Sequence, residues 1–324
     1  MDNVKISVVI PTRSRPALVI RALKSVMAQT LKPLEIIVVI DGPDEATLKA
    51  LKSIKNEKLK IMALPENLGK ADARNVGIKA ASGEWIAFLD DDDEWLPEKL
   101  EKQIRAADKL PCPFPILASS IIGRTPKMDM VWPNRRPRPG EPVSEYLFVR
   151  NSLFKQDAGL LLTTTLMTKK SLLDEITFRN LKKHEDLDWI LRAARLKGVC
   201  FEIVLEPLAV WYIEDQRASA SRQYMWRHSL EWIRANQGLF TPRAYVGFIA
   251  TSLAPQALGQ GQWQAFPALF KEMFRYGAPR AMDLLLFMGM WLLPQHIRRA
   301  VRSLFKGRGI FKKSRKRESW MENV

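Results

Sequence analysis

The sequence predicts an α/β fold, with a mostly parallel β-sheet, flanking helices and a further helical region at the C-terminus. Over the first hundred residues, uninterrupted apolar runs alternate with segments in which apolar residues recur every three or four positions. Such runs are typical of strands that helices cover on both faces. Polar residues follow three of the runs, at Thr12, Asp41 and 90–93, and ligands bind at the carboxyl ends of parallel strands. Helical periodicity returns from about residue 219 onward.

Each element of the first hundred residues has its own signal. The strand runs are rich in β-branched residues, which favour extended backbone, and turn residues such as Gly42 and Pro43 close them. The segments between them carry apolar residues on one face, which favours helices. We expect strands at 6–10, 34–40, 59–64 and 85–89, and helices at 15–29, 44–54 and 71–81.

The middle of the chain carries weaker signals. Five prolines between residues 123 and 145 predict a loop-like stretch. Proline is favoured in the first turn of a helix, so helices should start at Thr241-Pro242 and at Ala278-Pro279. The other expected elements are a strand at 160–167, a helix from 184 to about 197 that Gly198 ends, and a strand at 199–205. We therefore predict two domains, 1–216 and 217–324.

Positive charge is concentrated in the C-terminal third. The 324 residues carry a net charge of +16, and residues 217–324 alone hold 18 basic and 5 acidic side chains. Such a surface attracts phosphate polymers or anionic lipids. Cys112 and Cys200 lie far apart in apolar sequence, so we expect buried free thiols in a reducing compartment. The first residues lack the pattern of a secretory signal, so none is expected.

Four consecutive aspartates, Asp90 to Asp93, are the strongest chemical signal in the chain. Carboxylates crowded at the end of a buried strand repel one another unless a cation or hydrogen-bond donors neutralise them. Mg²⁺ and Mn²⁺ prefer such oxygen ligands and keep positions open for phosphate. The alternative is an acidic loop that caps a helix starting near Pro97, but a cap needs one aspartate and not four.

Four ordered motifs run along the predicted first domain. They read VVIPTR at 8–13, IIVVIDG at 36–42, NLGKADARN at 67–75 and GEWIAFLDDDD at 83–93, with Gly77 between the last two. This set resembles the family 2 glycosyltransferases, which have the GT-A fold, a Rossmann-like and mostly parallel sheet. The resemblance is strong over 4–104, and Glu185-Asp186 extends it to about residue 220. It implies a nucleotide diphosphate sugar as the donor and displacement with inversion at the anomeric carbon.

The resemblance also implies the residues of the donor site. Asp41 resembles the acid that hydrogen-bonds the nucleotide base, and Arg74 resembles a residue that faces the nucleotide, where a cation would offset diphosphate charge. From the residues alone, Asp41 is equally a turn former before Gly42, and Arg74 equally belongs to a solvated helix face. The predicted donor-binding residues are Pro11, Thr12, Arg15, Asp41, Arg74, Asp90 and Asp91.

The metal and the general base are predicted in the same way. Asp90 and Asp92 match the family's Asp-x-Asp motif, with Asp92 as the favoured ligand of Mn²⁺ or Mg²⁺, although acids at all four positions leave the assignment open by one residue. Glu185 and Asp186 resemble the catalytic pair, in which the second acid removes the proton of the acceptor hydroxyl. The alternative is that both acids complement a helix dipole. We expect Asp188 to be structural, His184 to be a solvated neighbour and Trp189 to be a core residue.

Together these features predict a hexosyl-type, inverting glycosyltransferase. It would act in polysaccharide or glycolipid synthesis, with a saccharide or a lipid-linked saccharide as the acceptor. We expect it in the cytoplasm, peripheral on the cytoplasmic face of the membrane. Two other classes stay open. A nucleotidyltransferase needs a glycine-rich loop, which 11–15 lacks. In a non-catalytic membrane or nucleic-acid binding protein on a degenerate fold, the acids would not be retained.

The predicted membrane contact is the segment 281–317. Its apolar part, 281–293, is too short to span a bilayer, and residues 298–317 contain ten lysines or arginines and no acid. An apolar helix followed by a basic stretch suits the interface of an anionic membrane. The alternative is a core helix with a solvated tail. A nucleic-acid arm is disfavoured, since it would leave the apolar part unexplained.

Overall fold

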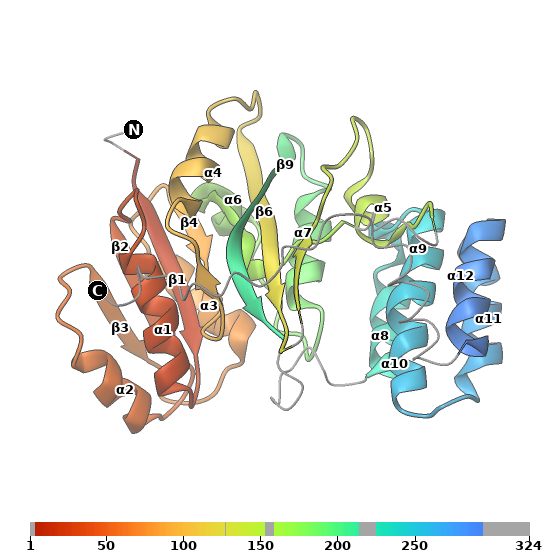
Figure 1. Ribbon diagram of the computed structural model, residues 1–324, viewed down its shortest axis with the longest axis horizontal. Helices are drawn as coiled ribbons and strands as arrows, with labels where there is room; N and C mark the ends of the chain where they lie inside the picture. The colour runs from red at the N-terminus through yellow and green to blue at the C-terminus, as the bar shows by residue number, and fades with distance from the viewer. Residues whose placement is uncertain (1–3, 127, 153–158, 214–224, 294–324) are drawn as a thin grey trace. The chain divides into compact units, whose positions relative to one another are not determined.

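The computed structural model describes residues 4–126, 128–152, 159–213 and 225–293. They form two compact units (Figure 1). The first unit contains the described parts of 1–132 and 161–214, and the second contains those of 133–160 and 215–310. The first domain, expected as an unbroken 1–216, therefore loses 133–160 to the second unit.

The first unit is built on one nine-stranded sheet, which confirms the α/β fold class (Figure 1). The order is β3-β2-β1-β4-β8-β6-β9-β5, and β7 pairs with β6. Strands β1 to β4 are mutually parallel, while β8, β5 and β7 run antiparallel to their neighbours. The strands are β1 (Ile6–Thr12), β2 (Glu35–Ile40), β3 (Leu59–Ala63), β4 (Trp85–Phe88), β5 (Glu94–Trp95), β6 (Phe114–Arg124), β7 (Asp129–Trp132), β8 (Met167–Lys169) and β9 (Val199–Tyr212).

The parallel part of the sheet is the core of this unit. Every residue of β1, β2 and β4 is buried, because helices flank the sheet and apolar side chains can leave water on both faces. The helices of the first unit are α1 (Pro16–Met27), α2 (Glu45–Lys52), α3 (Lys70–Ala80), α4 (Lys99–Ala107), α6 (Lys170–Glu175) and α7 (Glu185–Ala193), with a 3₁₀ turn, η1, at Thr163–Thr165.

Helix α3 lies unusually close to the sheet. A Cβ atom added to Gly77 would stand 2.5 Å from Cγ1 of Val9 on β1 and 3.3 Å from Cγ2 of Val39 on β2. Only a residue without a side chain permits this approach. Since Gly69 at the start of the helix has a φ of +91°, the chain enters α3 by a turn that also favours glycine. The two glycines thus fix the position of Lys70 and Arg74.

The structure corrects several expectations for the middle of the chain. The stretch 123–145 is not all loop, since it contains β7 and the start of helix α5 (Val143–Phe148). The strand expected at 160–167 is wrong, because η1 occupies its centre and β8 begins only at Met167. Strand β9 is longer than 199–205, because it pairs along the whole of β6. Helix α7 ends at Ala193 with Ala194 as its C-cap, four residues before the expected end, so Gly198, which has a φ of +84°, does not end it.

The prediction of buried free thiols is also wrong. A disulfide bond joins Cys112 and Cys200, with Cα atoms 6.2 Å apart, and both residues are only half-buried. The physical reason is the parallel pairing of β6 with β9, which places Pro115 opposite Cys200. Two cysteines that are 88 positions apart therefore meet at one end of the sheet.

The second unit is helical in its described residues. Rings of Phe148, Trp232, Phe240, Tyr245 and Phe248 pack at centroid distances of 5.0–6.4 Å and form one apolar core. Helix α9 starts at Pro242 with Thr241 as its N-cap, as expected, whereas α12 starts two residues after Pro279. The helices are α5, α8 (Trp226–Ala235), α9 (Pro242–Phe248), a π turn η4 (Ile249–Leu253), α10 (Ala254–Gly259), α11 (Ala265–Arg275) and α12 (Ala281–Leu292). None of the helices described is long and apolar enough to cross a membrane.

Candidate active site

The predicted site residues of the sheet lie at one edge. Strand β1 ends at Thr12, which pairs with Ile40 of β2, and Asp41 follows directly. Strand β4 is parallel to β1 and is followed by the acidic run 90–93. Pro11 is a buried residue within β1, paired with Val39. The carboxyl ends of three adjacent strands therefore present these residues together, as parallel topology requires.

Burial divides the four aspartates into two kinds. The buried ones, Asp91 and Asp93, are 6% and 3% exposed. The side chains of Asp90 and Asp92 are 36% and 23% exposed. The alternation follows the local backbone, because Asp93 N–H bonds back to Asp90 O in a turn at the strand end. Only Asp90 and Asp92 offer carboxylate oxygens to a ligand at this edge.

Asp91 is held by two residues of the β1–α1 connection. Thr12 Oγ1 donates to Asp91 Oδ2 at 2.7 Å, and Arg15 Nη1 lies 3.1 Å from Asp91 Oδ1 and 3.2 Å from Asp92 Oδ2. Burial raises the pKa of Asp91 to about 6, with the charges of Asp92 and Asp90 adding to it, although Thr12 and Arg15 act in the opposite direction. The site is therefore crowded with negative charge.

Arg74 lies under this acidic run. Its side chain is 1% exposed, and Nη2 donates to Asp90 Oδ1 at 2.6 Å. A solvated helix face is therefore the wrong interpretation of Arg74. Burial acts to raise the pKa of Asp90, but the charges of Arg74 and Lys70 outweigh it and hold that pKa below its usual value. Asp90 is thus kept ionised next to the strand end.

Arg74 and Lys70 connect the aspartates to helix α7. Glu185, which is 2% exposed, forms an ion pair with Lys70 Nζ, and Arg74 Nη1 lies 3.8 Å from the same Oε1 atom. Burial and the charge of Arg74 lower the pKa of Lys70, while Asp186, Asp90 and Asp92 act to raise it. The ammonium group of Lys70 therefore lies among the acids of both halves of the site.

Asp186 is the half-buried acid of the α7 pair. Its Oδ2 accepts a hydrogen bond of 3.3 Å from Thr163 Oγ1, and its Oδ1 accepts one of 2.8 Å from the backbone of Leu187. The helix N-terminus also favours its negative charge. Two contacts therefore orient this carboxylate without burying it.

Asp188 and Trp189 are a structural and a core residue, as expected, whereas His184 is half-buried. Asp188 is fully buried and forms an ion pair with Arg192 at 2.6 Å. Trp189 is also fully buried and stacks on Phe178 at 5.2 Å. His184 precedes the helix with a φ of +69°, a conformation that few residues other than glycine adopt. These residues shape the start of α7.

Asp41 does more than form a turn. Its Oδ1 accepts from the backbone N–H of Leu68 at 2.7 Å, and its Oδ2 accepts from that of Gly69 at 3.1 Å. The carboxylate is 6% exposed and ties the loop before α3 to the end of β2. A contact of Asp41 with a nucleotide base stays a prediction.

Sequence reasoning missed Lys70 and Arg21. Lys70 stands four positions before Arg74, so helical spacing puts both cations on one face of α3 and was a usable signal. Arg21 on α1 lies 2.8 Å from Glu94 Oε1 and donates to the carbonyl of Asp92 at 2.6 Å, with its guanidinium 4.0 Å from the ring of Tyr212. Its role depends on residues nearly 200 positions away, so local sequence gave no signal for it.

The residues fit a divalent cation that a phosphate shares. No group of three or more acidic, histidine or cysteine side chains in the described part of the chain is arranged as an all-protein metal cage. Mg²⁺ and Mn²⁺ in phosphate-transfer sites take one or two carboxylates and complete their shell with substrate oxygens and water. Asp90 and Asp92 provide two such carboxylates, with side chains 36% and 23% exposed at the end of β4.

The family follows from a sequence comparison. The model of glycosyl transferase family 2 matches residues 7–172, more than half of the chain. The chain belongs to this family. A relative named as the amylovoran biosynthesis glycosyltransferase AmsB of Erwinia amylovora is 28% identical over 253 residues, 75% of this chain and 81% of that protein. The uncharacterized glycosyltransferase YwdF of Bacillus subtilis is 34% identical over 200 residues, 59% of this chain and 68% of that protein.

Solved structures share the fold of this family 2 glycosyltransferase. A crystal structure of Staphylococcus aureus TarS, residues 1–349, in complex with UDP-GlcNAc has a TM-score of 0.55 at 20% identity and covers 93% of this chain and 89% of that one. The mannosyltransferase PcManGT of Pyrobaculum calidifontis, in complex with GDP-Man and Mn²⁺, has a TM-score of 0.55 at 16% identity, with 93% and 84% covered. At these identities the likeness shows the GT-A fold alone.

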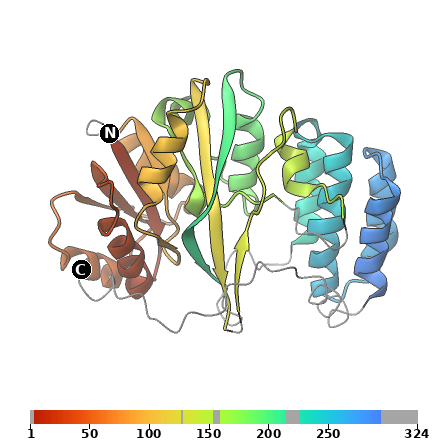
Figure 2. The ribbon, with the colours of Figure 1, turned by 45° about the horizontal axis from the view of Figure 1, so that its top comes forward.

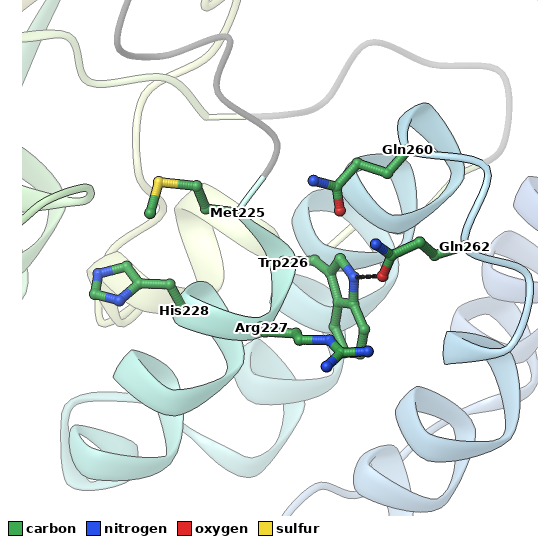
Figure 3. A pocket seen from close by; sticks show the side chains of 6 residues that line it. All are labelled: Met225, Trp226, Arg227, His228, Gln260 and Gln262. Carbon is green, nitrogen blue, oxygen red and sulfur yellow. Dashed lines mark hydrogen bonds between the residues drawn. The ribbon is translucent and has the colours of Figure 1, made fainter.

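The second unit of this family 2 glycosyltransferase contains a pocket of its own. The pocket has a volume of about 260 Å³ (Figure 3). Trp226 Nε1 donates to Gln262 Oε1 at 2.5 Å across it. Its lining residues are Met225, Trp226, Arg227, His228, Gln260 and Gln262, and none of them is a predicted site residue. The pocket therefore carries no part of the chemistry considered below.

Proposed function

We propose that the first unit transfers a hexosyl group from a nucleotide diphosphate sugar to a hydroxyl of a saccharide or lipid-linked saccharide, with inversion. One observation carries the proposal. The half-buried carboxylates Asp90 and Asp186 belong to separate elements, yet the buried Arg74 connects them. Arg74 donates to Asp90 at 2.6 Å and lies 3.8 Å from Glu185, the residue before Asp186. The residues proposed to hold the metal and the diphosphate are thereby linked to the proposed general base.

Asp92 and Asp90 are the residues that would hold Mn²⁺ or Mg²⁺. Both carboxylates are reachable, whereas Asp91 and Asp93 are buried. When bound, such an ion acts as a Lewis acid and stabilises the charge of the departing nucleoside diphosphate. Arg74 donates a hydrogen bond to Asp90, which orients this carboxylate and keeps it ionised. Arg74 therefore acts on the donor site through Asp90.

The donor nucleotide is assigned to the ends of β1 and β2. The Arg15 side chain is 31% exposed while it touches Asp91 and Asp92, so it can also meet a phosphate oxygen. Asp91, which accepts a hydrogen bond from Thr12, holds Arg15 in place, and Pro11 lies next to Thr12 in β1. Asp41 orders the loop 67–69, and this loop edge is where we place the base.

Asp186 is the proposed general base. It is half-buried, accepts a hydrogen bond from Thr163 and lies in the first turn of helix α7. It would take the proton of the acceptor hydroxyl as that oxygen attacks the anomeric carbon and the bond to the diphosphate breaks. Glu185 is buried and paired with Lys70 and Arg74. We assign Glu185 to positioning rather than to proton transfer.

The comparisons support the substrate classes. TarS is in complex with UDP-GlcNAc, and PcManGT is in complex with GDP-Man and Mn²⁺. Because both proteins share the fold of this chain, these complexes favour a nucleotide sugar as the donor here. AmsB is named for the biosynthesis of amylovoran, which favours a growing polysaccharide as the acceptor. Both assignments rest on likeness and on the chemistry of the site.

The test compares three isosteric variants. We expect Asp92→Asn to lower the transfer rate by about 10²-fold or more and to weaken its dependence on Mn²⁺. Asp186→Asn should lower kcat by about 10²–10⁴-fold while binding of the nucleoside diphosphate is kept. Asp174→Asn on α6, whose side chain is 55% exposed, is the control and should be neutral. Full activity in both site variants would overturn the assignment. Release of pyrophosphate from a nucleoside triphosphate would instead favour a nucleotidyltransferase.

A further inference from the structure

The α11–α12 pair of the second unit exposes an apolar surface. In the described part of the chain, eight large apolar side chains are exposed, and six of them belong to this pair or flank it. Leu285 and Leu292 are 57% and 69% exposed. The six residues are Trp263, Phe274, Tyr276, Leu285, Leu292 and Leu293. Such a concentration on one helix pair marks an interaction surface.

The geometry of α12 separates a buried face from an exposed one. Asp283, Phe287 and Trp291 are buried and recur every four residues, while Leu285 and Leu292 are seven residues apart and share the outer face. Rings of Phe266 and Phe287 hold α11 against α12 at 5.4 Å, and both views show the two helices side by side (Figures 1 and 2). Because α11 holds α12 in place, Leu285 and Leu292 are exposed in the folded helix pair, and fraying of the helix is not the cause of their exposure.

The exposed charges of the segment 261–293 are all positive. Between residues 261 and 293 the only acids are Glu272 and Asp283, and both are 2% exposed. Glu272 pairs with Arg234 and accepts from Tyr245, and Asp283 caps the start of α12. Lys271, Arg275 and Arg280 are exposed. The sequence continues with ten basic residues and no acid over 298–317.

From this juxtaposition we infer that the α11–α12 surface docks on an anionic lipid bilayer. The apolar side chains would enter the headgroup region, and the three exposed cations would face lipid phosphates. With 12 residues, α12 is about 18 Å long, too short to cross a hydrocarbon core of about 30 Å. It would therefore lie in the interface. Trp263, which is 60% exposed and packs on Trp291 at 5.8 Å, suits the same depth.

The charge pattern disfavours two other occupants. A second copy of this chain would bring like charges together across a two-fold axis, which opposes association. A nucleic acid would satisfy the cations, but it would leave exposed leucines without a partner. An anionic bilayer is complementary to both the charges and the apolar side chains.

Flotation of the full chain with vesicles tests this docking. We expect binding to vesicles of phosphatidylcholine with phosphatidylglycerol and little binding to phosphatidylcholine alone. The double variant Leu285→Gln with Leu292→Gln should weaken binding about tenfold or more. Both side chains are exposed, so folding should be unaffected. The control is Leu34→Gln with Leu205→Gln, at 41% and 40% exposure in the first unit, and it should bind like the parent.

A second variant separates the charge from the apolar contribution. Lys271→Gln with Arg275→Gln should weaken binding to anionic vesicles by about fivefold per charge and leave the thermal unfolding midpoint unchanged. The proposal is overturned if the leucine variant binds as tightly as the parent, because the basic residues 298–317 then suffice. A stable dimer in light scattering that dissociates in the leucine variant would likewise overturn it.

Discussion

At the scale of single residues, the site is defined by which acids are buried. The resemblance favours Asp92 as the metal ligand, but acids at all four positions leave that assignment open by one residue. Burial at the strand end separates the four, since Asp91 and Asp93 are enclosed while Asp90 and Asp92 keep contact with solvent. The assignment of the metal ligands stays a prediction. The sequence could supply the residue types and their place after a buried strand. It could not supply Lys70 as their common neighbour, because that contact depends on how α3 meets α7.

Lys70 carries the prediction at this scale. Its ammonium group pairs with the buried Glu185 and faces Asp186, Asp90 and Asp92. We expect Lys70→Met to lower kcat about 10-fold or more with a smaller change in the donor KM, because Asp186 loses a nearby positive charge. Steady-state kinetics of sugar transfer, with the donor varied, measure both parameters.

A merely structural role of Lys70 would give a different result. Lys70→Arg keeps the charge and should restore most of kcat. Lys70→Met removes one ion pair of the buried Glu185 and leaves the one with Arg74, so a lower unfolding midpoint is expected as well. Lower stability alone leaves the kcat of the folded molecules unchanged. A parent-like kcat of folded Lys70→Met would refute the positioning role.

At the scale of elements, the sequence predicts most clearly those strands that are buried on both faces of the sheet. Strands β1 and β2 are wholly buried, so their apolar runs are unambiguous. Strand β7 is half-buried throughout and lies among prolines, which hides it. Strand β8 has three residues, too few for any periodic pattern. The strands that end at the candidate site, β1, β2 and β4, are wholly buried. For this reason the sequence predicts them more clearly than the other strands of the sheet.

Gly77 tests how closely helix α3 must pack against the sheet. A Cβ at this position would meet Val9 and Val39, so we expect Gly77→Ala to lower the free energy of unfolding by about 1–3 kcal/mol. It should also raise the KM for the donor, because α3 carries Lys70 and Arg74. Urea unfolding and donor titration measure the two effects. Gly238→Ala is the matched control, since its Cβ would have no neighbour within 4 Å. Equal stability of the two variants would contradict the close packing of α3.

At the scale of the whole molecule, contacts distant in sequence decide the division into units. Residues 133–160 leave the first unit because α5 packs on α9. Glu145 accepts a hydrogen bond from Thr241 at 2.8 Å, and Phe148 meets Phe248 edge-on at 5.0 Å. These partners are about 100 positions apart, so composition and local periodicity give no warning of them. The domain division expected after residue 216 rests on a change in charge along the sequence and stays a prediction.

The disulfide between Cys112 and Cys200 is the other long-range contact of this scale. It ties the starts of β6 and β9 across 88 residues, and closing a loop of that length removes entropy from the unfolded chain. We expect the paired substitution Cys112→Ser with Cys200→Ser to lower the free energy of unfolding by about 2–4 kcal/mol. Dithiothreitol should destabilise the parent by a similar amount and leave the variant unchanged. Mass spectrometry after alkylation provides the direct check, because both thiols should react only once the protein is reduced. Thiols that react without reductant would show that the pair is open in the isolated protein, and the parent and the variant should then unfold at the same urea concentration.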